Sequence, residues 1–61
     1  MYEIYTAKLV VIRKSDRKIE YCDIRRAAQI TSTAMCEIED AIKRFGVFKS
    51  KYHEVNIVRQ L

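Results

Sequence analysis

The chain has 61 residues, which is room for a single domain (residues 1–61) with one small hydrophobic core. Hydrophobic residues make up 49% of it, with no proline and one glycine, which excludes a disordered or low-complexity chain. The net charge of +4 moderately favours polyanionic partners. The longest apolar run, residues 9–12, is too short to cross a bilayer, and the N-terminus lacks a signal-peptide pattern. We therefore expect a cytoplasmic protein without membrane contact.

Residue types that carry chemistry are few. Cys22 and Cys36 are the only cysteines and lack CxxC spacing, so we expect two reduced thiols, with a disulfide as the alternative. His53 is the only histidine, whereas zinc usually takes four ligands, so we expect no metal and no other cofactor. The chain has no glycine-rich phosphate loop and no convincing nucleophile–base set. We expect that it is not an enzyme.

Residues 2–14 carry two apolar stripes at helical spacing, which predicts a first helix that is apolar on two sides. The first stripe is Tyr2, Tyr5, Leu9 and Ile12, and the second is Ile4, Ala7 and Val11. The second stripe suggests a homodimer contact. A strand is the competing interpretation, because Tyr, Ile, Thr and Val are good strand formers.

A polar turn at residues 15–18 precedes an alternating segment, 19–21, that predicts a very short strand. Asp23 then suits the N-cap of a helix that runs to about Gln29. The hydroxyl residues 31–33 interrupt the pattern, and a second helix is predicted over 33–45. Gly46 supplies the left-handed residue that commonly ends a helix. Residues 47–51 and 55–59 flank 52–54 and predict a hairpin.

The helix over 33–45 presents one continuous apolar face, which predicts the centre of the core. That face consists of Met35, Ile38, Ile42 and Phe45, and we expect Ile24, Ala28, Leu9 and Ile57 to pack against it.

The expected order is helix, short strand, helix, helix and hairpin, with a Thr/Ser turn between the last two helices. This order resembles the winged helix-turn-helix family, through Ile24 and Ala28, the turn at Ile30 and Thr31, the face of helix 33–45, and Gly46. The resemblance implies an α+β fold of three helices with a C-terminal β-hairpin wing. It also implies a partner, double-stranded DNA, with helix 33–45 in the major groove and the wing 47–59 on the backbone. Small phage or plasmid regulators and excisionases are similar in size and plan. By that analogy we expect a transcriptional regulator or an architectural or recombination factor, in the host cytoplasm if phage-encoded.

The candidate DNA-binding residues fall into four groups. Hydroxyls at a helix N-terminus suit phosphates or base edges, cations suit phosphates, wing-tip rings reach sugars or a groove, and a glutamate can accept from cytosine. The groups are Thr31, Ser32 and Thr33; Arg25, Arg26, Lys43, Arg44, Lys49 and Lys51; Tyr52 and His53; and Glu37.

The charge distribution opposes part of this assignment. Within residues 23–45, four cations are balanced by four anions, and the positive excess lies instead at residues 13–18 and on the wing. The alternative function is therefore a protein-interaction module that uses the acidic face of helix 33–45, with Glu37 and Asp40, to bind another protein.

Overall fold

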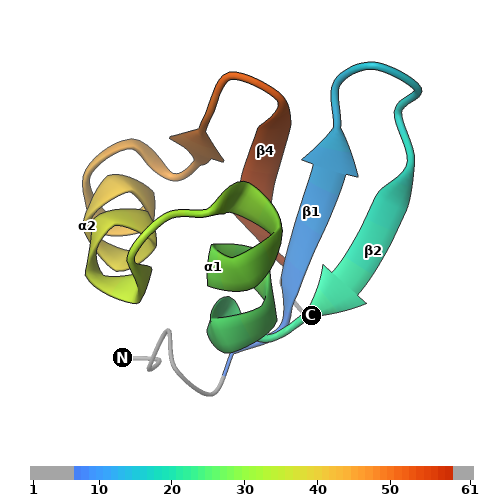
Figure 1. Ribbon diagram of the computed structural model, residues 1–61. Coiled ribbons are helices and arrows are strands. Elements are labelled where there is room, and N and C mark those ends of the chain that lie inside the picture. Colours follow the sequence, from blue (N-terminus) through green and yellow to red (C-terminus); the bar gives the residue numbers. More distant parts are fainter. Residues whose placement is uncertain (1–6, 59–61) are drawn as a thin grey trace.

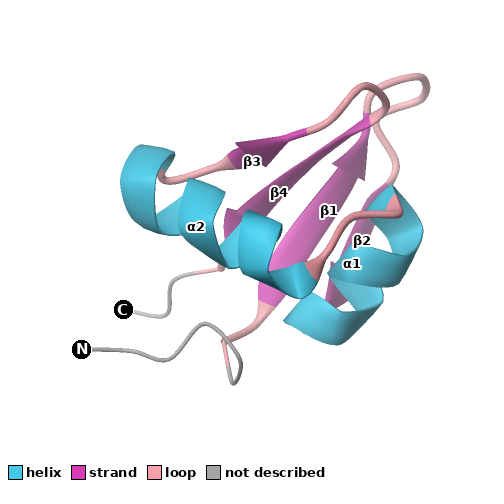
Figure 2. Ribbon diagram, turned by 60° about the vertical axis from the view of Figure 1, so that its left-hand side comes forward, coloured by secondary structure: helices cyan, strands magenta, loops and turns pink. Residues whose placement is uncertain are grey.

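The computed structural model describes residues 7–58, and two helices there lie between two β-hairpins (Figure 1). The N-terminal hairpin consists of β1 (Leu9–Arg13) and β2 (Ile19–Cys22), and the C-terminal hairpin of β3 (Phe48–Lys49) and β4 (His53–Ile57). The helices are α1 (Ile24–Thr31) and α2 (Met35–Phe45). The strands form one antiparallel sheet in the order β2-β1-β4-β3, and both helices cover the same face of it (Figure 2).

The predicted three-helix winged helix-turn-helix fold is wrong, because residues 9–13 form the strand β1 and not part of a first helix. Leu9 and Val11 point into the core, whereas Val10 and Ile12 lie on the opposite, open face of the sheet and are half-buried. A strand that is apolar on both faces produces spacings of three as well as two, so it imitates a helical stripe. Pairing with β2 on one side and β4 on the other satisfies the β1 backbone.

The homodimer contact that was expected on the first helix is affected by this correction. Val11 is 3% exposed inside this chain's own core and is not available to a second chain. Ala7 is half-buried, and Ile4 lies outside the described residues.

The short strand, the two remaining helices and the C-terminal hairpin are confirmed. Asp23 caps α1 by accepting a hydrogen bond from the backbone N–H of Arg26, at 2.9 Å. Gly46 ends α2 in the left-handed conformation, with φ of 79°, as the sequence predicts. The start of α2 differs from the prediction: the helix begins at Met35, and its N-cap, Ala34, provides no side-chain hydrogen bond.

The core lies between the helices and the central strands β1 and β4. Its buried side chains are Leu9, Val11, Ile24, Ala27, Ile38, Ile42 and Val55, with Ala28 and Ile57 packed against them at half burial. Met35 and Phe45, predicted as core, are 36% and 75% exposed. They lie in the first and last turns of α2, and only the middle of the helix, at Ile38 and Ile42, is buried.

Candidate nucleic-acid interface

The turns of the two hairpins lie side by side at one end of the sheet, at the top of Figure 1. Lys14 joins them: its backbone N–H donates to the carbonyl oxygen of Tyr52 at 2.9 Å, and its Nζ donates to that of Ser50 at 2.8 Å. The two turns therefore form one surface. We call residues 13–18 and 49–54 the basic end.

Each turn is also fixed by its own hydrogen bonds. In the β1–β2 turn the backbone N–H of Arg13 donates to the carbonyl of Lys18 at 2.8 Å, and that of Arg17 donates to the carbonyl of Arg13 at 2.7 Å. In the β3–β4 turn the N–H of Ser50 donates to the carbonyl of His53 at 2.8 Å, and the N–H of His53 donates to Ser50 Oγ at 3.1 Å. The backbone that carries the basic side chains is thus ordered before any ligand arrives, which lowers the entropic cost of binding.

The basic end concentrates the protein's positive charge. Its six Lys and Arg side chains are all exposed, and it contains two carboxylates, Asp16 and Glu54. Asp16 lies 3.6 Å from Arg13 with both side chains about half exposed, which makes this a weak surface pair. Glu54 is the cross-strand neighbour of Lys49 and offsets part of its charge. The cations are Arg13, Lys14, Arg17, Lys18, Lys49 and Lys51.

A hollow of about 100 Å³ lies at the basic end, beside the last turn of α1. Small-molecule pockets usually measure roughly 300–1,000 Å³, so the hollow is too small for a cofactor. It is lined by Val11, Arg13, Lys18, Ile19, Glu20, Ile30 and His53.

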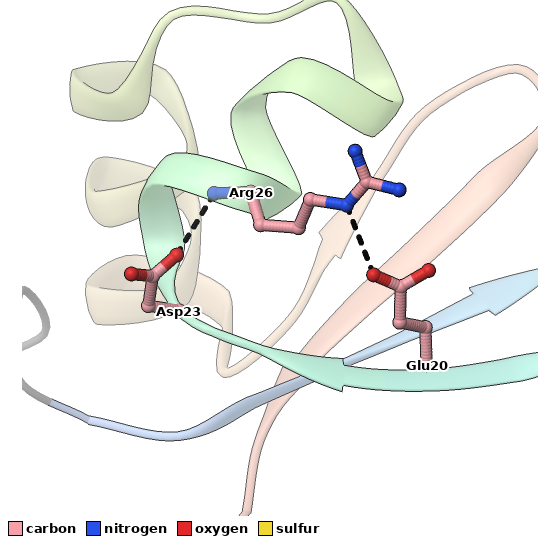
Figure 3. A network of polar contacts seen from close by, with 3 residues as sticks. All are labelled: Glu20, Asp23 and Arg26. Carbon is pink, nitrogen blue, oxygen red and sulfur yellow. Dashed lines mark hydrogen bonds and ion pairs between the residues drawn. The ribbon is translucent and has the colours of Figure 1, made fainter.

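Cations on the helices are largely paired, in contrast to those of the basic end. Arg26 Nε lies 3.0 Å from Glu20 on β2, a contact shown in Figure 3, and the hydrogen bond from this guanidinium to Glu20 raises the pKa of Arg26. On α2, Lys43 Nζ is 3.3 Å from Glu39 and Arg44 Nε is 3.1 Å from Asp40, one turn earlier in each case. Arg25 is exposed on α1. The helix surface is therefore close to neutral.

The hydroxyl cluster does not begin α2, and this corrects the prediction. Thr31 Oγ1 donates to the carbonyl of Ala27 at 2.8 Å, and Thr33 Oγ1 donates to the carbonyl of Thr31 at 3.0 Å. Ser32 is the left-handed C-cap of α1, with φ of 54°. These side chains finish α1, so two of the three hydroxyl hydrogens are already used within the chain.

The remaining predicted site residues occupy two places. Tyr52 is 62% exposed in the β3–β4 turn, and Lys51 Nζ lies 5.3 Å from the centre of its ring. His53 was expected at the tip of the wing, but it is half-buried as the first residue of β4 and lines the hollow. Glu37 is exposed in the first turn of α2.

Four of the six cations of the basic end were missing from the predicted site, namely Arg13, Lys14, Arg17 and Lys18. The excess of charge at residues 13–18 was visible in the sequence. The sequence did not reveal where these four cations lie relative to the wing. The predicted first helix separated them from the wing, whereas the pairing of β1 with β4 brings them beside it.

The two thiols occupy different elements and are not joined. Cys22 is half-buried at the end of β2, where burial and the nearby carboxylates of Glu20 and Asp23 raise the pKa of its thiol, whereas Cys36 is exposed on α2. Within residues 7–58, no cluster of three or more His, Cys, Asp or Glu residues is placed to hold a metal ion. No helix in this part of the chain has the length and apolar character needed to span a membrane.

No protein-family model matches the chain, and no curated protein or solved structure is significantly similar to it.

Proposed function

We propose that this protein binds double-stranded DNA through the basic end. The observation that carries the proposal is the joining of two cationic turns by the hydrogen bonds of Lys14 to Tyr52 and Ser50. Six Lys and Arg side chains extend from this rigid backbone against two partly exposed carboxylates. Such a surface gains affinity from a polyanion mainly by releasing its condensed counterions.

A nucleic-acid backbone fits this surface better than a small ligand does. The cations are spread over two turns, and the hollow beside Arg13 and Lys18 measures only about 100 Å³. In this proposal Arg13 and Lys18 contact one backbone phosphate, and Lys51 and its neighbours contact adjacent phosphates. Phosphate contacts of this kind position a protein on a duplex without reading its sequence.

Helix α2 contributes less to DNA affinity in this proposal than the resemblance implied. Lys43 and Arg44 are engaged by Glu39 and Asp40, so moving them to phosphates requires breaking these pairs. Glu37 adds a negative charge to the exposed first turn of the helix. Contacts from α2 to base edges remain part of the proposal only as a source of sequence preference.

The test compares two lysine substitutions by fluorescence anisotropy with a labelled random-sequence duplex, over a series of salt concentrations. We expect Lys51→Ala to weaken binding and to make the plot of log affinity against log salt shallower by about one unit. Lys43→Ala is the matched control, because it removes the same charge from an exposed lysine that is paired with Glu39. We expect Lys43→Ala to leave the slope unchanged.

Two results would contradict the proposal. Absence of binding to the duplex at low salt would exclude DNA as a partner. A change of slope for Lys43→Ala but not for Lys51→Ala would place the DNA on α2 and not on the basic end. Thermal melting of each variant verifies that it is folded.

The second candidate is a protein partner on α2, and the exposure of apolar side chains at the two ends of this helix favours it. Phe45 is 75% exposed and Met35 36%, with Glu37 between them in sequence. Phenylalanine and methionine are among the residues enriched at protein interfaces. A partner captured by the protein and lost on Phe45→Ala, with no DNA binding at low salt, would favour this function.

A further inference from the structure

Strand β2 forms an open edge of the sheet, and three of its four residues are exposed. An edge strand presents unpaired backbone N–H and C=O groups and is a template for pairing with another chain. In Figure 1 it is the outermost strand, beyond β1. The other edge, β3, has only two residues, and one of them is Lys49. A short edge strand and a lysine on it both discourage pairing with another chain.

The register identifies which β2 backbone groups are free. The N–H of Arg13 donates to the carbonyl of Lys18, so these two residues are a hydrogen-bonded pair of the ladder. Hydrogen-bonded and non-bonded pairs alternate along an antiparallel ladder. Glu20 and Cys22 therefore bond to β1, whereas Ile19 and Tyr21 direct their backbone groups away from it, toward solvent.

The side chains of these two residues have a cross-strand neighbour on one side only. Ile19 is 57% exposed and Tyr21 62%, on the face of the sheet that neither α1 nor α2 covers. Each stands opposite an apolar residue of β1: Ile19 opposite Ile12, and Tyr21 opposite Val10. On the other side of each, at the free edge, residues 7–58 contribute no further strand.

We propose that two copies of this chain pair through their β2 edges, antiparallel, with Ile19 of each copy opposite Tyr21 of the other. In a two-fold pairing, residues that stand opposite one another must share a face of the sheet. Odd-numbered residues of β2 therefore stand opposite odd-numbered residues of the second copy, and even-numbered opposite even-numbered. This register allows both outward-facing residues of each copy to exchange their backbone hydrogen bonds. It also creates an aromatic–β-branched cross-strand pair, which stabilises a sheet.

The β2 edge is complementary to a second copy of itself, and this is why we assign a second copy of the chain as its partner. The pairing continues an apolar row from Val10 and Tyr21 of one copy to Ile19 and Ile12 of the second. Of the two neighbouring registers, the one with Tyr21 opposite Tyr21 would place Ile19 against the carboxylate of Asp23. The one with Ile19 opposite Ile19 would place Tyr21 against Arg17, outside β2. On the helix face, the chosen register brings the two Glu20 side chains together. Arg26 lies 3.0 Å from Glu20 and supplies a compensating charge to each.

The paired backbone groups of Ile19 and Tyr21 lie outside the two turns of the basic end, and Ile19 also lines the hollow beside them. The contact is short, so it falls in the class of small, transient interfaces, and we expect a dissociation constant on the order of 0.1 mM.

The test uses sedimentation of the full chain at increasing concentration with proline substitutions at the two edges. Tyr21→Pro removes an N–H that is not used within the monomer, and proline is tolerated at such edge positions. We expect it to abolish the concentration-dependent dimer. Lys49→Pro is the matched control, since it removes the outward N–H of the opposite edge, and we expect it to leave the dimer intact. If circular dichroism shows that Tyr21→Pro is unfolded, Ile19→Lys, which places a charge at the exposed edge, takes its place with the same expected loss.

Hydrogen exchange then identifies the contact. The amides of Ile19 and Tyr21 should become protected as the protein concentration rises, while that of Lys49 does not. A strict monomer at about 1 mM, ten times the expected dissociation constant, would overturn the proposal. So would a dimer in which these two amides stay unprotected, which would indicate stacking of the open sheet faces instead.

Discussion

Truncation of α2 side chains provides the sharpest test of how the helix packs. Ile38 and Phe45 lie on the same helical face, two turns apart, and the sequence pattern alone treats them as equivalent. In the structure Ile38 is 0% exposed and Phe45 is 75% exposed. We therefore predict that Ile38→Val, which removes a single methylene group, destabilises the protein more than Phe45→Ala, which removes an entire ring.

The magnitudes follow from burial. Removing one buried methylene costs about 0.8 kcal/mol in transfer free energy, and Ile→Val substitutions in cores cost about 0.5–1.5 kcal/mol. An exposed substitution away from special features usually changes stability by about 0.5 kcal/mol or less. At roughly 0.05–0.15 kcal/mol per residue, a chain of this length has about 3–9 kcal/mol in all. Ile38→Val therefore removes a measurable share of the total without unfolding the protein.

Urea unfolding monitored by circular dichroism measures both variants. We expect a lower midpoint and an unchanged slope for Ile38→Val, and a midpoint close to the parent for Phe45→Ala. If Phe45→Ala is the more destabilising of the two, the ring is buried in the folded protein and the described packing of α2 is wrong.

Three further predictions concern the surface and the helix ends. Glu37→Lys should raise nonspecific DNA affinity several-fold if α2 approaches the duplex and leave it almost unchanged if the basic end alone makes contact, which anisotropy distinguishes. Alkylation followed by mass spectrometry should modify Cys36 first and Cys22 only at higher pH, because burial raises the pKa of the Cys22 thiol; equal rates at all pH values would contradict this. Gly46→Ala should lower the free energy of unfolding by about 1 kcal/mol, because φ is 79° and an L side chain is strained there, although no atom lies within 4 Å of an added Cβ. Gly46→Asn should cost less, since asparagine tolerates this conformation better. Thermal or urea unfolding measures both, and no loss for alanine would refute the prediction.

The sequence by itself determined most of the local structure between residues 19 and 57, although not the start of α2. Asp23 is a good N-cap, the apolar spacing along α2 fits only a helix, and Gly46 ends it, so these signals are contained within short windows of the chain. The change to β-branched residues after Gly46 likewise predicted the C-terminal hairpin. Each of these features depends on neighbours a few residues away, which is why sequence reasoning identified them.

The candidate site was only partly accessible to the sequence. The charged residues in the sequence show a positive excess at residues 13–18 and on the C-terminal hairpin. This excess of positive charge is the basis of the proposed function. The ion pairs that neutralise α2 follow i,i+4 spacing, as for Lys43 with Glu39, and were open to sequence reasoning. That residues 13–18 lie beside the β3–β4 turn was not, since it depends on contacts such as that of Lys14 with Ser50, 36 residues away.

Only the tertiary structure decided the identity of β1 and the extent of the core. Residues 9–13 have no helix or strand signal strong enough to choose between the two, and pairing with β2 and β4 together selects the strand. The same pairing leaves Met35 and Phe45 exposed, because the sheet buries only the middle of α2. Pairing between distant strands depends on both segments together, so the residue pattern of one segment alone does not predict it.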